Sequence, residues 1–265
     1  MKHSIRILLL LSFFTAYTIQ ASILDNVRSF WTTNKEVVSK EQILTPQSTF
    51  EIENTKGNIT IKTWKQNKLV VEAVKKGSPE AIAATEIVTK YTENGATVKT
   101  VQSDSQSKCT VDYTILIPHT ANITLAHTDH GNINIKNINE PAKVQTYRGS
   151  IICQNVTNSI HANTRYGNIK IHAKKLGKQH KILAVSGRGN IKLELPSKTP
   201  ASLYAKAQRG KVTSDHPVTL AQQPMQITQK TMANLRRDIT GKMGSIEGVT
   251  IKLHASSGNV KLVEA

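Results

Sequence analysis

The chain has 265 residues, a formal net charge of +17 and 5% aromatic residues, so a large core would have to consist mainly of Ile, Val, Leu and Ala. Two cysteines are too few for a disulfide framework, which excludes the small disulfide-stapled class of secreted protein. The excess of positive charge favours anionic partners.

Residues 1–21 have the pattern of a secretory signal peptide. Lys2 and Arg6 precede a short apolar run, and Ala21 offers a small residue for cleavage. The run is interrupted by polar residues and is short for a membrane span of about 20 residues, although a membrane anchor is the alternative. No second apolar segment could span a bilayer. We therefore predict an exported chain that is periplasmic, cell-surface or secreted and has no transmembrane span after signal cleavage.

Residues 22–48 form a less regular N-terminal segment. Its apolar residues fit an amphipathic helix that could cap the open end of a stack of strands, and a helix on a membrane surface is the alternative. These residues are Leu24, Val27, Phe30 and Trp31. Residues 49–118 form a β-rich lead-in. They contain strand candidates at 68–74 and 110–117, one helical turn near 79–84, and a hairpin around Asn94-Gly95.

A short phrase of Gly, Asn, Ile or Val, a polar residue and an apolar residue recurs along the chain. It begins at Gly57, Gly131, Gly149, Gly167, Gly189, Gly210 and Gly258, with substitutions in the copies at 149 and 210. The five central copies lie about 18–22 residues apart, which is the length of one solenoid coil. Each phrase alternates apolar and polar residues, as a strand with one buried face does. The glycine suits a corner that needs a positive φ or has no room for a Cβ.

A second, weaker strand precedes each phrase and keeps the same period. Stacked coils pair strand over strand about 4.8 Å apart and share one core. We therefore predict an all-β fold, a single-domain β-solenoid over residues 49–265 that resembles a parallel β-helix and has a loop or insertion near 217–248. The predicted inward columns and a ladder of Asn side chains follow from the register. The first column holds Ile133, Ile151, Ile169, Ile191 and Val212, the second holds Ile135, Cys153, Ile171 and Leu193, and the ladder holds Asn132, Asn168 and Asn190.

The repeated phrases resemble those of the bacterial putative-adhesin family, a group of β-solenoid domains. The lead-in from Phe50 to Ile59 and the closing stretch from Ile251 to Val260 carry the same resemblance, which covers residues 48–263. The resemblance implies a solenoid fold and a surface-adhesion role without a shared active site. Similar domains often have Asp where this chain has Asn after the glycine, and this difference makes the present chain unusually basic.

The sequence carries no recognisable catalytic constellation. Residues 119–217 contain four acidic residues, Asp129, Glu140, Glu194 and Asp215, whose spacing gives no pair for glycoside hydrolysis and no cluster for calcium. His127 and His130 could share a metal, but solvated turn histidines are the favoured explanation. We predict no enzyme activity, no metal and no cofactor.

Cys109 and Cys153 could form a disulfide in an exported protein. The alternative is that both are buried thiols, and Cys153 falls at a predicted core position.

The strongest candidate for a binding site is the residue that precedes each corner glycine. Arg148, Tyr166, Arg188 and Arg209 occupy this position, and Arg165 stands beside Tyr166. If the corners stack, these arginines form an edge with an aromatic side chain between them, which suits an acidic polymer or the face of a sugar or base. The alternative is that corner charges keep the solenoid soluble and block edge-to-edge association.

We therefore predict a non-catalytic adhesin-like or envelope-associated binding module. Its expected partner is an anionic glycan or another anionic cell-surface polymer, with no specific nucleic acid. The alternatives are a structural envelope protein that associates with itself or another protein, and a carbohydrate-active enzyme on a parallel β-helix.

Overall fold

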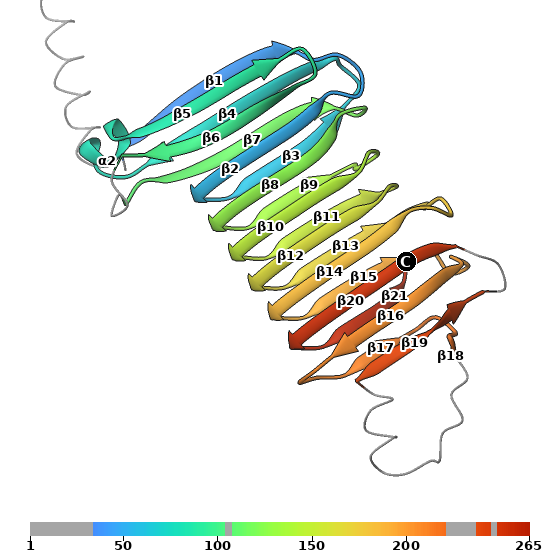
Figure 1. Cartoon of the computed structure of the whole chain (residues 1–265). Coiled ribbons are helices and arrows are strands. Elements are labelled where there is room, and N and C mark those ends of the chain that lie inside the picture. Colours follow the sequence, from blue (N-terminus) through green and yellow to red (C-terminus); the bar gives the residue numbers. More distant parts are fainter. Residues whose placement is uncertain (1–33, 104–107, 221–236, 245–247) are drawn as a thin grey trace, which may run out of the picture.

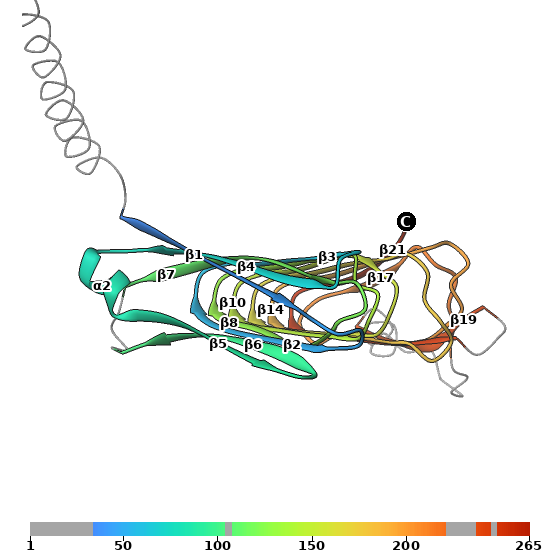
Figure 2. The ribbon, with the colours of Figure 1, turned by 90° about the horizontal axis from the view of Figure 1, so that it is seen from above.

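The computed structural model describes residues 34–103, 108–220, 237–244 and 248–265, which form an elongated stack of flattened coils (Figure 1). Two long sheets face each other across a narrow core, as Figure 2 shows from above. Sheet A has the strand order β1-β4-β7-β3-β9-β11-β13-β15-β21-β17, and sheet B has the order β18-β19-β16-β20-β14-β12-β10-β8-β2-β6-β5. The predicted all-β solenoid is confirmed.

Each coil places one strand in each sheet. In sheet B these strands are β6 (Gly95–Gln102), β2 (Thr49–Lys56), β8 (Asn122–His130), β10 (Ala142–Arg148), β12 (Ile160–Tyr166), β14 (Lys181–Arg188), β20 (Val249–Ser257) and β16 (Ala201–Ala207). In sheet A the strands that complete the same coils are β7 (Thr110–Pro118), β3 (Ile59–Trp64), β9 (Ile133–Lys136), β11 (Ile151–Val156), β13 (Ile169–Ala173), β15 (Ile191–Leu195), β21 (Val260–Glu264) and β17 (Val212–Ser214). Neighbouring coils pair in parallel in both sheets.

The spatial order of the coils differs from their order in the chain at both ends of the stack. The last coil, β20–β21, lies between β14–β15 and β16–β17. At the other end the coil β2–β3 lies between β6–β7 and β8–β9. The outermost coil at each end is therefore not the outermost coil in the sequence.

The inward columns are confirmed in the middle of the stack. Ile133, Ile151, Ile169 and Ile191 are successive partners, and each is buried. The column was predicted to continue from Ile191 to Val212. This is wrong, because Val260 lies between these two residues and pairs with both. The phrases that begin at Gly210 and Gly258 are locally alike, so the sequence pattern alone did not distinguish which one follows Ile191.

The corner glycines stack without room for a side chain. A Cβ on Gly149 would lie 1.8 Å from the carbonyl oxygen of Gly131, and a Cβ on Gly167 would lie 2.0 Å from the carbonyl oxygen of Gly149. Contacts this short do not occur for real Cβ atoms. The repeated glycine is therefore required because backbone packs directly on backbone at the corner.

The predicted Asn ladder is present beside the glycines, with a different bonding pattern. Asn132 Oδ1 accepts a hydrogen bond from the Ser150 backbone N–H at 2.8 Å, and Ser150 Oγ accepts one from the Asn168 N–H at 3.2 Å. Asn168 Oδ1 accepts from the Asn190 N–H at 2.7 Å. Each side-chain oxygen thus accepts a hydrogen bond from a backbone N–H of the next coil, not from the side-chain amide of the next Asn. This arrangement satisfies N–H groups that would otherwise lack partners at the turn.

Antiparallel strands flank the parallel stack at both ends. In sheet B, β16 is flanked by β19 (Asp238–Met243), which pairs in turn with β18 (Thr219–Leu220). At the opposite end, β4 (Lys68–Lys76) joins β7 to β1 (Lys35–Ile43), and β5 (Thr85–Thr92) forms the predicted hairpin with β6. The predicted helical turn is α2 (Pro79–Ala83). The described residues include no helix of the length and hydropathy needed to cross a membrane.

Two predictions about the termini fall partly or wholly outside the described residues. The signal peptide at 1–21 and the apolar residues of the predicted helical cap lie there. Within the remaining part of the 22–48 segment, residues 35–43 form strand β1, so the folded domain begins before residue 49. In the predicted loop region at 217–248, residues 238–243 form strand β19.

The register excludes a disulfide between Cys109 and Cys153. Cys109 precedes β7 and Cys153 lies in β11, and the strands β3 and β9 separate β7 from β11 in sheet A. Three strand spacings of about 4.8 Å place the two strands roughly 14 Å apart. A disulfide requires Cα atoms within about 7 Å, so the proposed bond cannot form in this fold.

Cys153 is expected to be unreactive in the folded protein. Its side chain is fully buried among the inward column, and this burial raises the pKa of its thiol to about 12. The reactive thiolate is therefore scarce at neutral pH. In a Cys109→Ala background, a thiol-specific chromogenic reagent should label Cys153 only as fast as the protein unfolds, and at once in denaturant. Rapid labelling of the native protein would contradict the buried placement.

Candidate anion-binding edge

The residues that precede the corner glycines line up along the C-terminal ends of the sheet B strands. Their order along the stack is Lys56, His130, Arg148, Tyr166, Arg188 and Ser257. One residue earlier in the strands, Tyr147 of β10 and Arg165 of β12 point outward. The result is an exposed edge, at the tight corner between the sheets, that gathers side chains from neighbouring coils.

Two tyrosines and three arginines form one cluster on this edge. The Tyr147 and Tyr166 rings meet edge to face, with centroids 5.6 Å apart. The Arg165 guanidinium lies 5.1 Å from the Tyr147 centroid and 5.6 Å from the Tyr166 centroid. Arg148 lies 5.8 Å from both centroids, and Arg188 lies 5.4 Å from Tyr166. We call these five residues the Arg–Tyr cluster.

The rings hold the arginines in place without neutralising their charge. A cation–π contact at an exposed site contributes about 0.5–1 kcal/mol, and each arginine of the cluster makes at least one. Within the described residues none of these arginines forms an ion pair with a carboxylate. Their guanidinium groups therefore keep hydrogen-bond donors available for an external anion.

Few acidic residues lie in the strands around the cluster, and the one in the adjacent strand β8, Asp129, lies beside His127. The neighbouring strands β10, β12, β14, β20 and β16 have no Asp or Glu in their sequences and together contain seven Lys and Arg residues. The outer face of sheet A differs, because Glu194 accepts from Lys170 at 3.2 Å and from Lys192 at 2.7 Å. Those hydrogen bonds, led by the one from Lys192, lower the pKa of Glu194. The arginines of the cluster therefore have no carboxylate partner among the described residues, whereas Lys170 and Lys192 on sheet A share Glu194.

The structure brings together four of the five predicted site residues. Arg148, Arg165, Tyr166 and Arg188 share the cluster, whereas Arg209 does not, because the inserted strand β20 places Ser257 next to Arg188. Sequence reasoning missed Tyr147. The repeat could have identified Tyr147, because this residue stands two positions before a corner glycine. Arg165 has the same position in the next copy.

His127 and His130 take separate positions. His127 Nε2 lies 3.0 Å from Asp129 Oδ1 on the outer face of β8, while the His130 ring sits 6.3 Å from the Tyr147 ring at the corner. His130 therefore extends the aromatic side of the Arg–Tyr cluster.

Comparisons with known proteins agree with this architecture. Curated protein sequences gave no match. A crystal structure of a putative cell adhesion protein from Clostridium sporogenes has 12% sequence identity and a TM-score of 0.50, with 87% of this chain and 100% of that chain covered. A putative adhesin from Bacteroides fragilis has 14% identity and a TM-score of 0.34, with 87% and 99% covered. The first of these likenesses, at a TM-score of 0.50, concerns the fold alone. The Toastrack DUF4097 family model matches residues 37–263, and the chain therefore belongs to the Toastrack DUF4097 family.

Proposed function

We propose that this protein is an exported, non-catalytic binding module that recognises an anionic polymer of a cell surface through the Arg–Tyr cluster. The observation that carries the proposal is that three arginines lie against two tyrosine rings and have no carboxylate partner among the described residues. A guanidinium group can bind a carboxylate, sulfate or phosphate with two parallel hydrogen bonds. The tyrosine rings add a surface on which a sugar can pack.

The position of the cluster suits a linear ligand. Successive coils repeat about every 4.8 Å, so Arg148, Tyr166 and Arg188 present a row of groups along the stack axis. A chain with regularly spaced acidic groups can contact several of them at once. The strands β10, β12, β14, β20 and β16, which contain no acidic residue, add a favourable field for an approaching polyanion.

The proposal predicts that single substitutions in the cluster weaken binding of an acidic glycan. A charge-assisted hydrogen bond contributes about 1.5–3 kcal/mol, so Arg188→Gln should lower affinity by about tenfold or more. Binding would be measured by calorimetry with polygalacturonate, and with dextran as the neutral polymer, across a salt series. Turnover of both glycans would be followed in the same samples.

Arg209→Gln is the matched control, because it removes the same charge from the same corner position outside the cluster. An equal loss of glycan affinity in Arg209→Gln and Arg188→Gln would show that binding depends only on the net charge of the protein. Tyr166→Ala should also weaken binding, whereas Tyr91→Ala, which removes a more exposed ring on the hairpin outside the cluster, should not. Release of reducing sugars would overturn the non-catalytic reading.

Self-association is the second candidate, and one observation favours it. Strand β1 is the edge of sheet A and exposes Val37 and Ile43 at 62% and 76%. Charged residues alternate with them along the same edge, and these oppose pairing with another strand. Self-association would be measured by analytical ultracentrifugation at several protein concentrations. An apparent mass that rises with concentration, and no longer does so in Val37→Lys, would support this candidate.

A further inference from the structure

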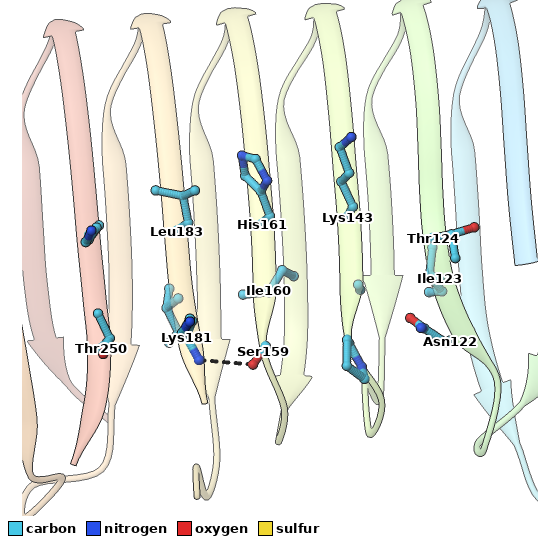
Figure 3. A pocket seen from close by; sticks show the side chains of 14 residues that line it. Asn122, Ile123, Thr124, Lys143, Ser159, Ile160, His161, Lys181, Leu183 and Thr250 are labelled. Carbon is cyan, nitrogen blue, oxygen red and sulfur yellow. Dashed lines mark hydrogen bonds between the residues drawn. The ribbon is translucent and has the colours of Figure 1, made fainter. Parts of the chain in front are cut away.

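A long groove crosses the outer face of sheet B at the N-terminal ends of its strands, at the opposite end from the Arg–Tyr cluster. Its larger section has a volume of about 650 Å³ and extends from β8 across β10, β12 and β14 to β20 (Figure 3). A second section of about 380 Å³ continues over β16 and β19. Thr250 and Lys252 line both sections, so the two sections lie next to each other.

The groove arises because the side chains along each strand point alternately to the outer face and into the core. One rim consists of outward residues in register, and these are Lys143, His161, Leu183 and Lys252. The other rim lies two residues earlier in each strand and includes Ser159, Lys181 and Thr250. Between the rims, residues such as Ala142, Ile160 and Ile182 point into the core. The floor therefore consists of backbone, bordered by the carbon stems of the rim side chains, and it runs parallel to the stack axis.

The floor offers few free hydrogen-bonding groups. Its backbone N–H and C=O groups are engaged in the parallel ladders of β10, β12, β14 and β20. The half-buried Leu183 on the first section and the exposed Leu220 on the second add apolar surface. A sugar on this floor would find hydrogen-bond partners only on the rims, so the floor itself favours an apolar chain.

The rims are positively charged. Lys143, Lys181 and Lys252 line the first section and Lys242 lines the second, while no acidic residue lines either one. None of these lysines forms an ion pair with a described residue. Partial burial, followed by the charge of Lys143, lowers the pKa of His161 and so favours the neutral form of its ring. An occupant must therefore combine apolar length with negative charge.

We propose that this groove binds one extended acyl chain of an anionic amphiphile, with the chain along the floor beside Leu183 and the acid group held by the rim lysines. The volume lies within the range of about 300–1,000 Å³ that is typical of small-molecule sites. The chemistry is shared by a free fatty acid and by a phospholipid. The site uses residues other than the Arg–Tyr cluster, so it stands independently of the proposed function.

The test measures binding of palmitate, palmitoyl-lysophosphatidylglycerol and hexadecanol to the purified protein by calorimetry, below the concentration at which each amphiphile aggregates. Palmitate or the lysolipid should bind with a stoichiometry of one, and the tighter of the two identifies the source of the acyl chain. Hexadecanol should bind at least several-fold more weakly. No binding of either anion, or equal binding of hexadecanol, would overturn the proposal.

Variants locate the site. Lys252→Gln should weaken binding several-fold, and Leu183→Asp should abolish it. Lys261→Gln is the matched control, because Lys261 is an exposed lysine in the same coil on sheet A. Arg188→Gln should leave amphiphile binding unchanged while it weakens binding of the acidic glycan. Circular dichroism confirms folding, and Leu183→Ser replaces Leu183→Asp if the latter is unfolded. Unchanged binding in folded Leu183 and Lys252 variants would contradict the assignment.

Discussion

Deletion of residues 249–265 is expected to abolish folding of the whole C-terminal half of the stack. In a solenoid whose coils stack in chain order, loss of the last coil removes only one interface. Here β20–β21 lies between two other coils, so its removal exposes Ile191 on one side and Val212 on the other. It also removes the buried side chains of Ile251, Leu253, Val260 and Leu262. At about 1.5–3 kcal/mol each, these four alone contribute about 6–12 kcal/mol, comparable with the stability of an entire domain.

An internal deletion provides the control. Replacement of residues 196–248 with the three-residue loop 157–159, which joins β11 to β12, would connect β15 directly to β20. This variant loses far more residues but keeps the central coils in contact, and it should unfold cooperatively in a urea titration monitored by circular dichroism. If the short terminal deletion folds and the long internal one does not, the strand order in both sheets is wrong.

Gly149→Ala is expected to destabilise the protein by more than about 4 kcal/mol or to prevent folding. The added Cβ would lie 1.8 Å from the carbonyl oxygen of Gly131, and the neighbouring coil cannot move away because its strands pair on both sides. Effects of this size arise from a small set of causes, and steric conflict with packed backbone is one of them. The free energy of unfolding would be measured in urea.

Gly177→Ala serves as the comparison within the same protein. A Cβ at Gly177 would approach the ring of His180 at 3.2 Å, and a flexible side chain can yield by that amount. Its effect should stay below about 1 kcal/mol. Similar losses for Gly149→Ala and Gly177→Ala would mean that the corner glycines are not packed as described.

The local features of the fold were predictable because each depends on a short stretch of sequence. The alternation after Gly131, Gly149, Gly167 and Gly189 predicts the inward columns, and the hairpin at Asn94-Gly95 follows from its turn residues. The coil order at the ends was not predictable in the same way. The copies at Gly210 and Gly258 carry nearly the same pattern, and only the packing of both faces decides which one contacts Gly189.

The candidate site depends on that same ordering. Arg148, Arg165, Tyr166 and Arg188 come from copies that are consecutive both in the chain and in space, so the repeat register alone brought them together. Arg209 follows them in the chain but not in the stack. Tyr147 was not predicted, because the expected edge was defined by the residue that directly precedes each glycine. Tyr147 lies one position earlier in its strand and completes the cluster.

The position of the C-terminal coil also determines when the protein can finish folding. Asn259 donates its backbone N–H to Asn190 across 69 residues of sequence, so β15 gains its permanent neighbour only when almost the whole chain is available. Until then β16–β17 has no coil to stack on, and contacts between residues so distant in sequence form slowly. A ribosome that still holds residues 249–265 would therefore leave β16–β17 without its neighbouring coil. The C-terminal part of the stack can assemble only after these residues have been released.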